Sequence, residues 1–273
     1  MKHVEAHGAR IPALGFGTFR LEGRRAEAMV ETALALGYRH IDTAQMYGNE
    51  AEVGRGIAAS GVARAAIWLT TKIWPDNFRP SDLQRAARAS VERLGTAPDL
   101  LLLHWPNPRV PLAETVGALN RVHQDGLARF IGVSNFNRAL VEEAWAASEA
   151  PLIVDQVEYQ PFLDQSVLLD ELRARGMGLI AYAPLAHGRV FEEPVLQRIG
   201  AAHGKTPGQV TLRWLVQQDG VCAIPKSGSE AHARANLEIF DFELSAEEVA
   251  AIHALARPNG RIIDPAGMAP DWD

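Results

Sequence analysis

The chain has 273 residues, of which 47% are hydrophobic and 22% are charged, and its formal net charge is −6. This mildly acidic, ordinary globular composition excludes a broad basic surface for nucleic acid or for anionic membranes. The single cysteine, Cys222, excludes an internal disulfide and a zinc site built on several cysteines. Because α/β barrels often run to about 250 residues as one unit, we expect a single domain over residues 1–273.

The sequence contains no segment that suggests export or membrane insertion. The first ten residues lack an apolar stretch of signal-peptide length, and no run approaches the roughly 20 apolar residues of a membrane span. We therefore expect a cytoplasmic protein that acts on a small molecule, with neither nucleic acid nor membrane as a partner. No exposed apolar helix face stands out, which favours a monomer.

Short apolar runs alternate with amphipathic runs along most of the chain. Residues Lys2–Ile11 are predicted to form a hairpin with its turn at His7 and Gly8, closing the N-terminal end of the fold. The predicted strands, nearly continuous in Val, Ile and Leu, are Leu14–Thr18, His40–Ala44, Ile67–Ile73, Leu100–His104, Arg129–Ser134, Ile153–Tyr159, Gly178–Ala183 and Val221–Pro225. The predicted helices are Arg25–Leu36, Glu50–Ala59, Ser81–Leu94, Leu112–Gln124, Asn137–Ser148, Ser166–Arg175, Pro207–Gln217 and Ser229–Leu237.

Eight strand–helix pairs with short connections predict an α/β fold, a (β/α)₈ TIM barrel, and a doubly wound parallel sheet is the alternative. Ser81 is expected to cap the third helix, and Gly95 to end it. The segment from Arg257 to Asp273 contains three prolines and two glycines and is predicted to be an irregular C-terminal tail. This tail either folds over the mouth of the barrel or packs on its surface.

Polar side chains stand where several predicted strands end, which is the face of a barrel that carries active sites. Asp42 ends the second strand and Tyr47 follows five residues later, Lys72 ends the third strand, and His104 ends the fourth. Each residue alone has a structural explanation, such as a cap or a satisfied core histidine. Their convergence on one end of the barrel is what a purely structural role does not predict.

The chemistry of these four residues is consistent with reduction of a carbonyl group. A lysine ammonium close to a tyrosine lowers the tyrosine pKa from about 10, and an aspartate keeps that lysine charged. Tyr47 can then donate a proton to a carbonyl oxygen, while a neutral His104 donates a hydrogen bond to the same oxygen. The sequence has no HExxH and no GxSxG motif, so we expect neither a metal site nor acyl transfer.

Several motifs in a fixed order resemble the aldo-keto reductase family. They are Gly15-Phe16-Gly17-Thr18, Gly37 to Ala44, Tyr47-Gly48-Asn49-Glu50, Thr70-Thr71-Lys72, Leu103-His104-Trp105-Pro106, Gly132 to Phe136 and Ile224-Pro225-Lys226-Ser227. The resemblance runs from Ile11 to about Leu255. It implies that Asp42, Tyr47, Lys72 and His104 are the family's catalytic tetrad. Within the family the chain is most similar to the bacterial 2,5-diketo-D-gluconic acid reductases of the B type, which also reduce methylglyoxal.

The resemblance also implies NADPH as the cofactor, bound without a GxGxxG motif. Amide and hydroxyl groups would bind the nicotinamide carboxamide, Tyr182 would stack beneath the ring, and Lys226 would meet a phosphate. The implied cofactor-binding residues are Ser134, Asn135, Gln156, Tyr182, Pro184, Leu185, Lys226, Ser227, His232 and Asn236. His232 replaces an arginine that is common in the family, and a histidine is a weaker, pH-dependent cation. We therefore expect NADPH to be preferred less strongly, with some use of NADH.

A second departure from the family pattern is Asp155, in place of a common asparagine beside Gln156. It is expected either to pair with a cation or to disturb the carboxamide pocket. The expected substrate pocket consists of Phe19, Trp74, His104, Trp105 and Phe136, with Met46 as a further wall residue.

The function implied by these residues is NADPH-dependent reduction of aldehydes and ketones, such as methylglyoxal, 2,5-diketo-D-gluconate and keto esters. Two alternatives stay open at this stage. One is a non-catalytic nicotinamide-binding barrel or accessory protein, and the other is a different barrel enzyme such as a hydrolase or isomerase.

Overall fold

Eight parallel strands form one closed sheet in the computed structural model, which describes residues 2–273. The strands follow one another in sequence order: β3 (Phe16–Gly17), β4 (His40–Asp42), β5 (Trp68–Ile73), β6 (Leu100–Leu103), β7 (Phe130–Ser134), β8 (Leu152–Glu158), β9 (Gly178–Tyr182) and β10 (Val221–Ala223). Parallel bridges from Leu14 to Ala223 and from Gly17 to Lys226 join the first strand to the last. The predicted (β/α)₈ barrel is confirmed, and the doubly wound alternative is wrong.

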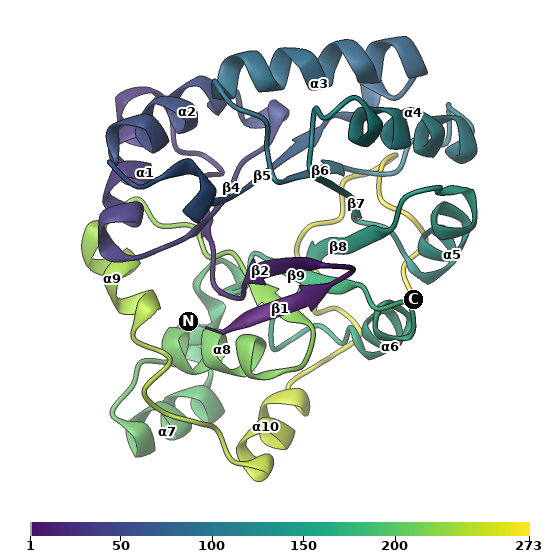
Figure 1. The fold of residues 1–273 in the computed structure, drawn as a ribbon. Coiled ribbons are helices and arrows are strands. Elements are labelled where there is room, and N and C mark those ends of the chain that lie inside the picture. The colour runs from purple at the N-terminus through teal and green to yellow at the C-terminus, as the bar shows by residue number, and fades with distance from the viewer. Residues whose placement is uncertain (1) are drawn as a thin grey trace.

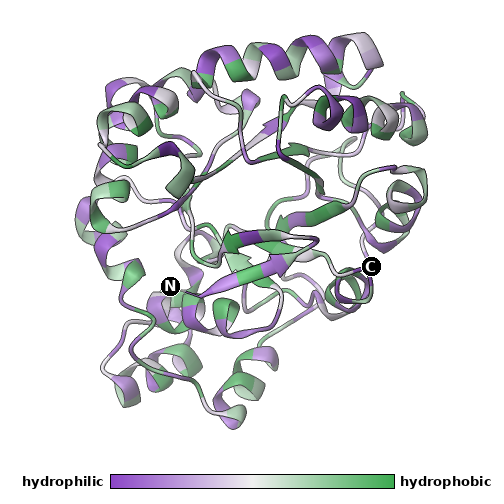
Figure 2. Ribbon diagram, in the orientation of Figure 1, coloured by the Kyte–Doolittle hydropathy of each residue, from purple (hydrophilic) through white to green (hydrophobic). Residues whose placement is uncertain are grey.

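Helices surround the barrel on its outer face (Figure 1). They are α1 (Gly23–Leu36), α2 (Glu50–Ala59), α3 (Pro80–Leu94), α4 (Leu112–Gln124), α5 (Arg138–Ala147), α6 (Ser166–Ala174), α7 (Pro194–His203), α8 (Pro207–Gln217), α9 (Glu230–Leu237) and α10 (Ala246–His253). Figure 2 shows hydrophobic strands inside this ring and helices that carry both hydrophobic and hydrophilic residues. This is the pattern of strands buried on both faces by amphipathic helices. Each helix of the described chain is too short or too polar to cross a bilayer.

Two helices, α7 and α10, were not predicted because they fall outside the alternation of one strand with one helix. Their start signals are nevertheless present in the sequence. Ser245 and Glu248 form a reciprocal capping box at the start of α10, and Glu193 caps α7. Ser81 was expected to cap α3, but Pro80 is already the first helical residue.

The predicted N-terminal hairpin is confirmed as β1 (His3–Ala6) paired antiparallel with β2 (Ala9–Pro12). Both turn residues, His7 and Gly8, have positive φ angles, of 47° and 81°, as a tight two-residue hairpin turn requires. The hairpin crosses one end of the barrel in Figure 1, and β1 contacts β9. The C-terminal ends of the strands therefore remain available for the site at the opposite end.

The C-terminal tail is irregular, as predicted, and it folds over the edge of the barrel mouth. The Gln160 side chain donates to the Gly260 carbonyl at 2.8 Å. The buried Glu158 carboxylate accepts from the backbone N–H groups of Ile262 at 2.9 Å and Ile263 at 2.7 Å. Ile263 consequently lines the main cavity. Of the two placements considered, the tail therefore folds over the mouth of the barrel.

Candidate active site

A cavity of about 440 Å³ opens at the C-terminal ends of the barrel strands. Every sheet strand except β5 either supplies a lining residue or is followed directly by one, as His104 follows β6. The lining residues are Gly17, Thr18, Phe19, Arg20, Asp42, Met46, Tyr47, His104, Trp105, Asn135, Gln156, Tyr182, Ala183, Pro184, Leu185, His187, Gly188, Phe191, Ile224, Pro225, Lys226 and Ile263. The predicted location at this end of the barrel is thus where the cavity lies.

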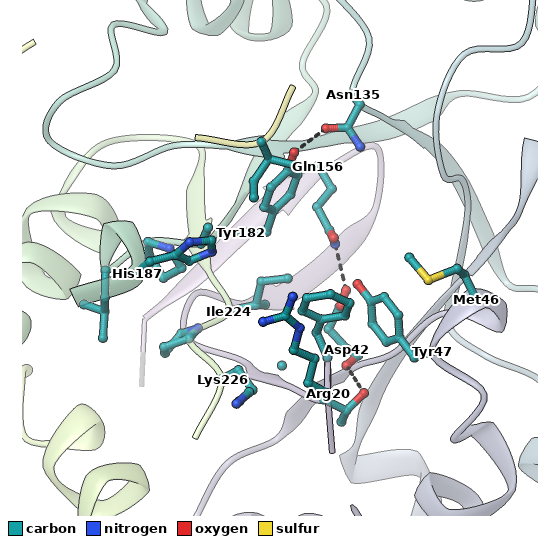
Figure 3. Close-up of a pocket in the computed structure, with 18 of the residues that line it drawn as sticks. Arg20, Asp42, Met46, Tyr47, Asn135, Gln156, Tyr182, His187, Ile224 and Lys226 are labelled. Carbon is teal, nitrogen blue, oxygen red and sulfur yellow. Dashed lines mark hydrogen bonds between the residues drawn. The ribbon is translucent and has the colours of Figure 1, made fainter. Parts of the chain in front are cut away.

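Lys72 and Asp42 form a buried ion pair at the cavity wall, in which Asp42 lines the cavity and Lys72 lies behind it. The Lys72 ammonium donates to Asp42 Oδ1 at 2.5 Å and to the Thr43 carbonyl at 2.8 Å. The second carboxylate oxygen of Asp42 accepts from the Gln156 amide at 2.7 Å, as Figure 3 shows. Burial lowers the pKa of Lys72, and the negative charge of Asp42 opposes that change. The pair therefore retains a cation where the barrel interior would otherwise disfavour one.

Tyr47 ends a short 3₁₀ turn, Gln45–Tyr47, and its hydroxyl lies 3.4 Å from the Lys72 ammonium. Gly48 follows with φ 67°, which lets the chain reverse and start α2 two residues later. Burial, and then the charge of Asp42, raise the pKa of Tyr47 well above its usual value of 10. The net direction is thus opposite to the lowering expected from Lys72, because burial is the largest influence on this pKa. The phenol is consequently protonated at neutral pH, as a proton donor must be.

His104 lies against Tyr47, with their ring centroids 5.9 Å apart and the planes nearly perpendicular. Burial, followed by the charge of Lys72, lowers the pKa of His104 well below 6.5, so the imidazole is neutral as expected. Its Nδ1 atom is buried with no hydrogen-bond partner among residues 2–273. The other nitrogen, Nε2, is therefore the one that can meet a ligand in the cavity.

A chain of hydrogen bonds connects the residues expected at the nicotinamide. The Tyr182 hydroxyl donates to Asn135 Oδ1 at 2.6 Å (Figure 3), and the Asn135 amide donates to the His104 carbonyl at 2.9 Å. Asn135 itself adopts a left-handed φ of 62°, which asparagine tolerates better than most residues. The Ser134 hydroxyl donates to the Gln156 carbonyl at 2.7 Å and is not part of the cavity lining. Ser134 thus supports Gln156 and does not face the cavity itself.

The remaining predicted cofactor residues divide into two groups. Pro184, Leu185 and Lys226 line the cavity together with Asn135, Gln156 and Tyr182. Ser227, His232 and Asn236 do not line it, and the last two lie on α9. The structure therefore brings six of the ten predicted residues to one cavity and leaves the α9 pair outside its walls.

The predicted substrate pocket is only partly assembled as expected. Phe19 and Trp105 line the cavity beside His104. Trp74 is not a lining residue but packs edge-on against His104, with the ring centroids 5.3 Å apart. Phe136 is completely buried in the hydrophobic core. Trp74 therefore supports the imidazole, and Phe136 serves the packing of the barrel.

Several lining residues were not predicted as site residues. Arg20 lies three residues after the end of β3 and has a left-handed φ of 60°. Figure 3 shows its guanidinium among the lining side chains. A search for every charged residue just after a strand would have found it. His187 and Phe191 lie in a kinked segment, Ala186–Glu192, whose shape the sequence does not indicate. Ile263 reaches the cavity only because the tail folds back.

Asp155 does neither of the two things expected of it. Its side chain is completely buried, it forms no ion pair among the described residues, and it does not line the cavity. Neither carboxylate oxygen has a hydrogen bond of good geometry, although the backbone N–H of Phe136 lies close enough to stabilise the charged form. Alternation along β8 turns it to the opposite side from Gln156. Burial raises its pKa well above the usual value, the backbone N–H of Phe136 opposes the rise, and the charge of Asp273 adds to it. The residue is thus a neutral acid between the barrel and the tail.

Comparison with known proteins places this site in a family. The sequence model of the Aldo/keto reductase family matches residues 13–257. The chain is 42% identical over 267 residues to methylglyoxal reductase DkgB of Salmonella typhimurium, covering 96% of this chain and 99% of that protein. It is 41% identical over 255 residues to glyoxal reductase of Bacillus subtilis, covering 92% of each.

Solved structures agree with this assignment. The crystal structure of "a putative 2,5-diketo-D-gluconic acid reductase B" has a TM-score of 0.98 and 52% identity, covering 100% of this chain and 98% of the other. The Bombyx mori aldo-keto reductase in complex with NADP has a TM-score of 0.89 and 32% identity, covering 96% of this chain and 94% of the other. The chain therefore belongs to the aldo/keto reductase family and is an NAD(P)H-dependent oxidoreductase that reduces carbonyl groups.

Proposed function

We propose that this protein reduces small aldehydes and ketones with NADPH, and that methylglyoxal and related dicarbonyls are among its substrates. The observation that carries the proposal is the buried Asp42–Lys72 pair directly beside the Tyr47 hydroxyl, with a neutral His104 at the same end of the cavity. The names of the Salmonella and Bacillus relatives support the substrate class.

The residues around the cavity fit a nicotinamide nucleotide. Tyr182 offers a flat ring, and Asn135 and Gln156 offer side-chain amides beside it, which match a planar ring that carries a carboxamide. Arg20 and Lys226 add two cations to a lining whose one carboxylate, Asp42, is already paired with a lysine. An anionic phosphate group is therefore favoured on the side of the cavity where these cations lie.

The cofactor, when bound, supplies the hydride that reduces the carbonyl carbon. The protein supplies the proton, because the Tyr47 hydroxyl donates its hydrogen to the carbonyl oxygen as the C=O double bond becomes a C–OH bond. Lys72 stabilises the negative charge left on the phenol oxygen, and Asp42 holds Lys72 in place. His104 orients the same oxygen through its Nε2–H group.

The preference for NADPH over NADH is expected to be modest. Lys226 is exposed at the cavity edge, where it can meet a phosphate. His232 is exposed on α9, and it replaces the arginine that the family resemblance would place there. A neutral histidine attracts a 2′-phosphate less strongly than a guanidinium does.

The test is the loss of reduced-nicotinamide absorbance with methylglyoxal, measured with NADPH and with NADH. Tyr47→Phe removes the proton donor and should lower kcat by about 10²- to 10⁴-fold while leaving the Kd for NADPH within about twofold. Tyr159→Phe is the matched control, since it deletes a buried hydroxyl bonded to Gln218, outside the cavity lining. Full activity of Tyr47→Phe would overturn the proposed mechanism, and no turnover of any carbonyl by the unmodified protein would overturn the function.

A further inference from the structure

Glu50 is a buried carboxylate on the outer side of the barrel wall, directly behind the catalytic lysine. It is the first residue of α2, three positions after Tyr47, and it is 1% exposed. Its Oε1 atom accepts from the Thr71 hydroxyl at 2.6 Å. Because successive side chains of a strand point to opposite faces, Thr71 faces the helix layer while the next residue, Lys72, faces the barrel interior. The Glu50 carboxylate and the Lys72 ammonium therefore lie on opposite faces of β5.

Glu50 forms an ion pair with Arg93 in which the two side chains differ in their exposure to water. Arg93 of α3 reaches the Glu50 Oε2 atom through Nη2 at 2.6 Å and Nε at 2.8 Å, and Ser90 lies 3.3 Å away. The Arg93 side chain is 39% exposed, whereas that of Glu50 is 1% exposed. Solvent screens the arginine more than the glutamate, so part of the negative charge remains unscreened toward the barrel.

The charged and titratable groups around Lys72 come from four elements. Asp42 of β4 contacts it directly at 2.5 Å, and Tyr47 of the 3₁₀ turn lies at 3.4 Å. His40 and His104 also interact electrostatically with Lys72, because the lysine charge helps to lower the pKa of each imidazole. Burial is the main influence lowering the pKa of Lys72, and the charges of Asp42 and Glu50 raise it. Among residues 2–273, these two carboxylates are the anions that favour the ammonium.

We propose that Glu50 is a positioning residue of the reductase site, a second carboxylate that acts through the barrel wall to keep the Lys72 ammonium ionised beside Tyr47. The proposal rests on the proposed role of Tyr47 as proton donor. It explains why a carboxylate with three polar contacts is buried next to the one strand that carries the catalytic lysine. A carboxylate used only to tie α2 to α3 would not affect how Lys72 titrates.

The direct test is the titration of Lys72 itself. The chain has only four lysines, Lys2, Lys72, Lys205 and Lys226, so ¹³Cε-lysine NMR resolves each one, and Lys72→Met assigns the buried signal. Glu50→Gln keeps the size of the side chain and an acceptor for Thr71 but removes the charge. The titration midpoint of Lys72 should fall by about 0.5 to 1 pH unit, which corresponds to a three- to tenfold loss in the equilibrium for holding the proton.

Arg93→Gln is the matched control because it breaks the same ion pair from the other side. It leaves the Glu50 carboxylate and removes its counter-charge, so the midpoint of Lys72 should rise. A purely structural role for the pair predicts shifts of the same sign in both variants, or none, and either result would overturn the proposal. Should Glu50→Gln fail to unfold cooperatively, Arg93→Gln alone decides, since only an upward shift supports the proposal.

The kinetic readout separates this inference from the proposed function. In the Glu50→Gln variant, the high-pH decline of kcat for carbonyl reduction should move to lower pH by the same amount as the NMR midpoint, with KM changed less than kcat. A protein that reduces no carbonyl would defeat the proposed function. The NMR midpoints of the two variants would still decide the role of Glu50.

Discussion

The polar residues of this site hold one another in place through shared partners. Asp42 offers one carboxylate oxygen to Lys72 and the other to Gln156, and Ser134 fixes the backbone of Gln156. A single substitution at Asp42 therefore disturbs both the proton-donating side and the expected nicotinamide side of the cavity. Networks of this kind depend on every member being satisfied, which makes them costly to alter one residue at a time.

His104 should make the stability of the protein depend on pH in the acidic range. Its pKa is lowered in the folded state, as is that of the buried His40, so below about pH 6.5 the unfolded chain binds protons that the folded protein does not. The free energy of unfolding should thus fall as the pH drops from 6.5 to 5, by up to ~1.4 kcal/mol per pH unit for each histidine. Urea unfolding at several pH values measures this slope. His104→Gln should remove the contribution of one proton from this slope of unfolding free energy against pH. An unchanged slope would contradict the assignment of a neutral His104.

At this scale the sequence identified residue types more reliably than their contacts. Asp42, Tyr47, Lys72 and His104 could be chosen because each polar residue follows an apolar strand that must end at the same face. The contacts of Ser134 could not be predicted, because a serine at a strand end can point either to a ligand or to its neighbouring strand. Asp155 was expected either to pair with a cation or to disturb the carboxamide pocket, because the sequence does not show that a carboxylate is buried without a cation beside it.

The helix α9 carries the features expected to select the cofactor. His232 and Asn236 lie four residues apart and so share one face of the helix. The Tyr38 hydroxyl donates to the Ala233 carbonyl at 2.9 Å, and Arg25 donates to the Gly228 carbonyl at 2.8 Å. The helix is thus fixed to the first strand–helix unit, which holds the position of its outward side chains.

His232→Arg should strengthen the preference for NADPH. A guanidinium on this face can form charge-assisted hydrogen bonds with a 2′-phosphate, and the ratio of kcat/KM for NADPH to that for NADH should rise about tenfold. Steady-state kinetics with both cofactors measure the ratio. Ala231→Arg is the control, since it adds the same charge to an exposed neighbouring position of the helix. Equal gains in the two variants would show a general charge effect and not a specific contact.

Element boundaries were predicted well where apolar periodicity and glycine agreed. Gly95 ends α3 with φ 68°, at the position expected for a left-handed cap. The failures, α7 and α10, came from assigning one helix to each strand. The capping box at Ser245 was readable, but the regular repeat left no place for another helix.

The tail connects the end of the chain to the substrate side of the cavity. Arg261 stacks on the Trp272 ring at 3.5 Å, and Trp272 lies 6.3 Å from the lining residue Trp105, measured between ring centroids. Asp273 accepts from the backbone N–H of Arg138 at the start of α5. The tail is therefore held by hydrogen bonds at Gly260 and at Asp273, and Ile263 lies between these two contacts at the cavity wall.

Gly260→Ala should loosen this arrangement without unfolding the barrel. A Cβ atom on residue 260 would lie 1.6 Å from the Phe162 carbonyl oxygen, so the backbone must move away. The KM for methylglyoxal should rise by about tenfold, equal to ~1.4 kcal/mol, while the Kd for NADPH stays within about twofold. Gly117→Ala in α4 is the control, since nothing lies within 4 Å of its Cβ position and it should only stabilise the helix. An unchanged KM in Gly260→Ala would show that the tail does not shape substrate binding.

Closure of the barrel has a consequence for how the protein is made. All four tetrad residues lie within the first 104 residues and are synthesised early. The last wall of the cavity forms only when residues 223–226 pair with the first strand. Until that part of the chain leaves the ribosome, β3 and β9 are open sheet edges of the kind that recruit other chains. Pairing between segments more than 200 residues apart is slow to nucleate. The barrel therefore cannot close until the final fifth of the chain has been synthesised.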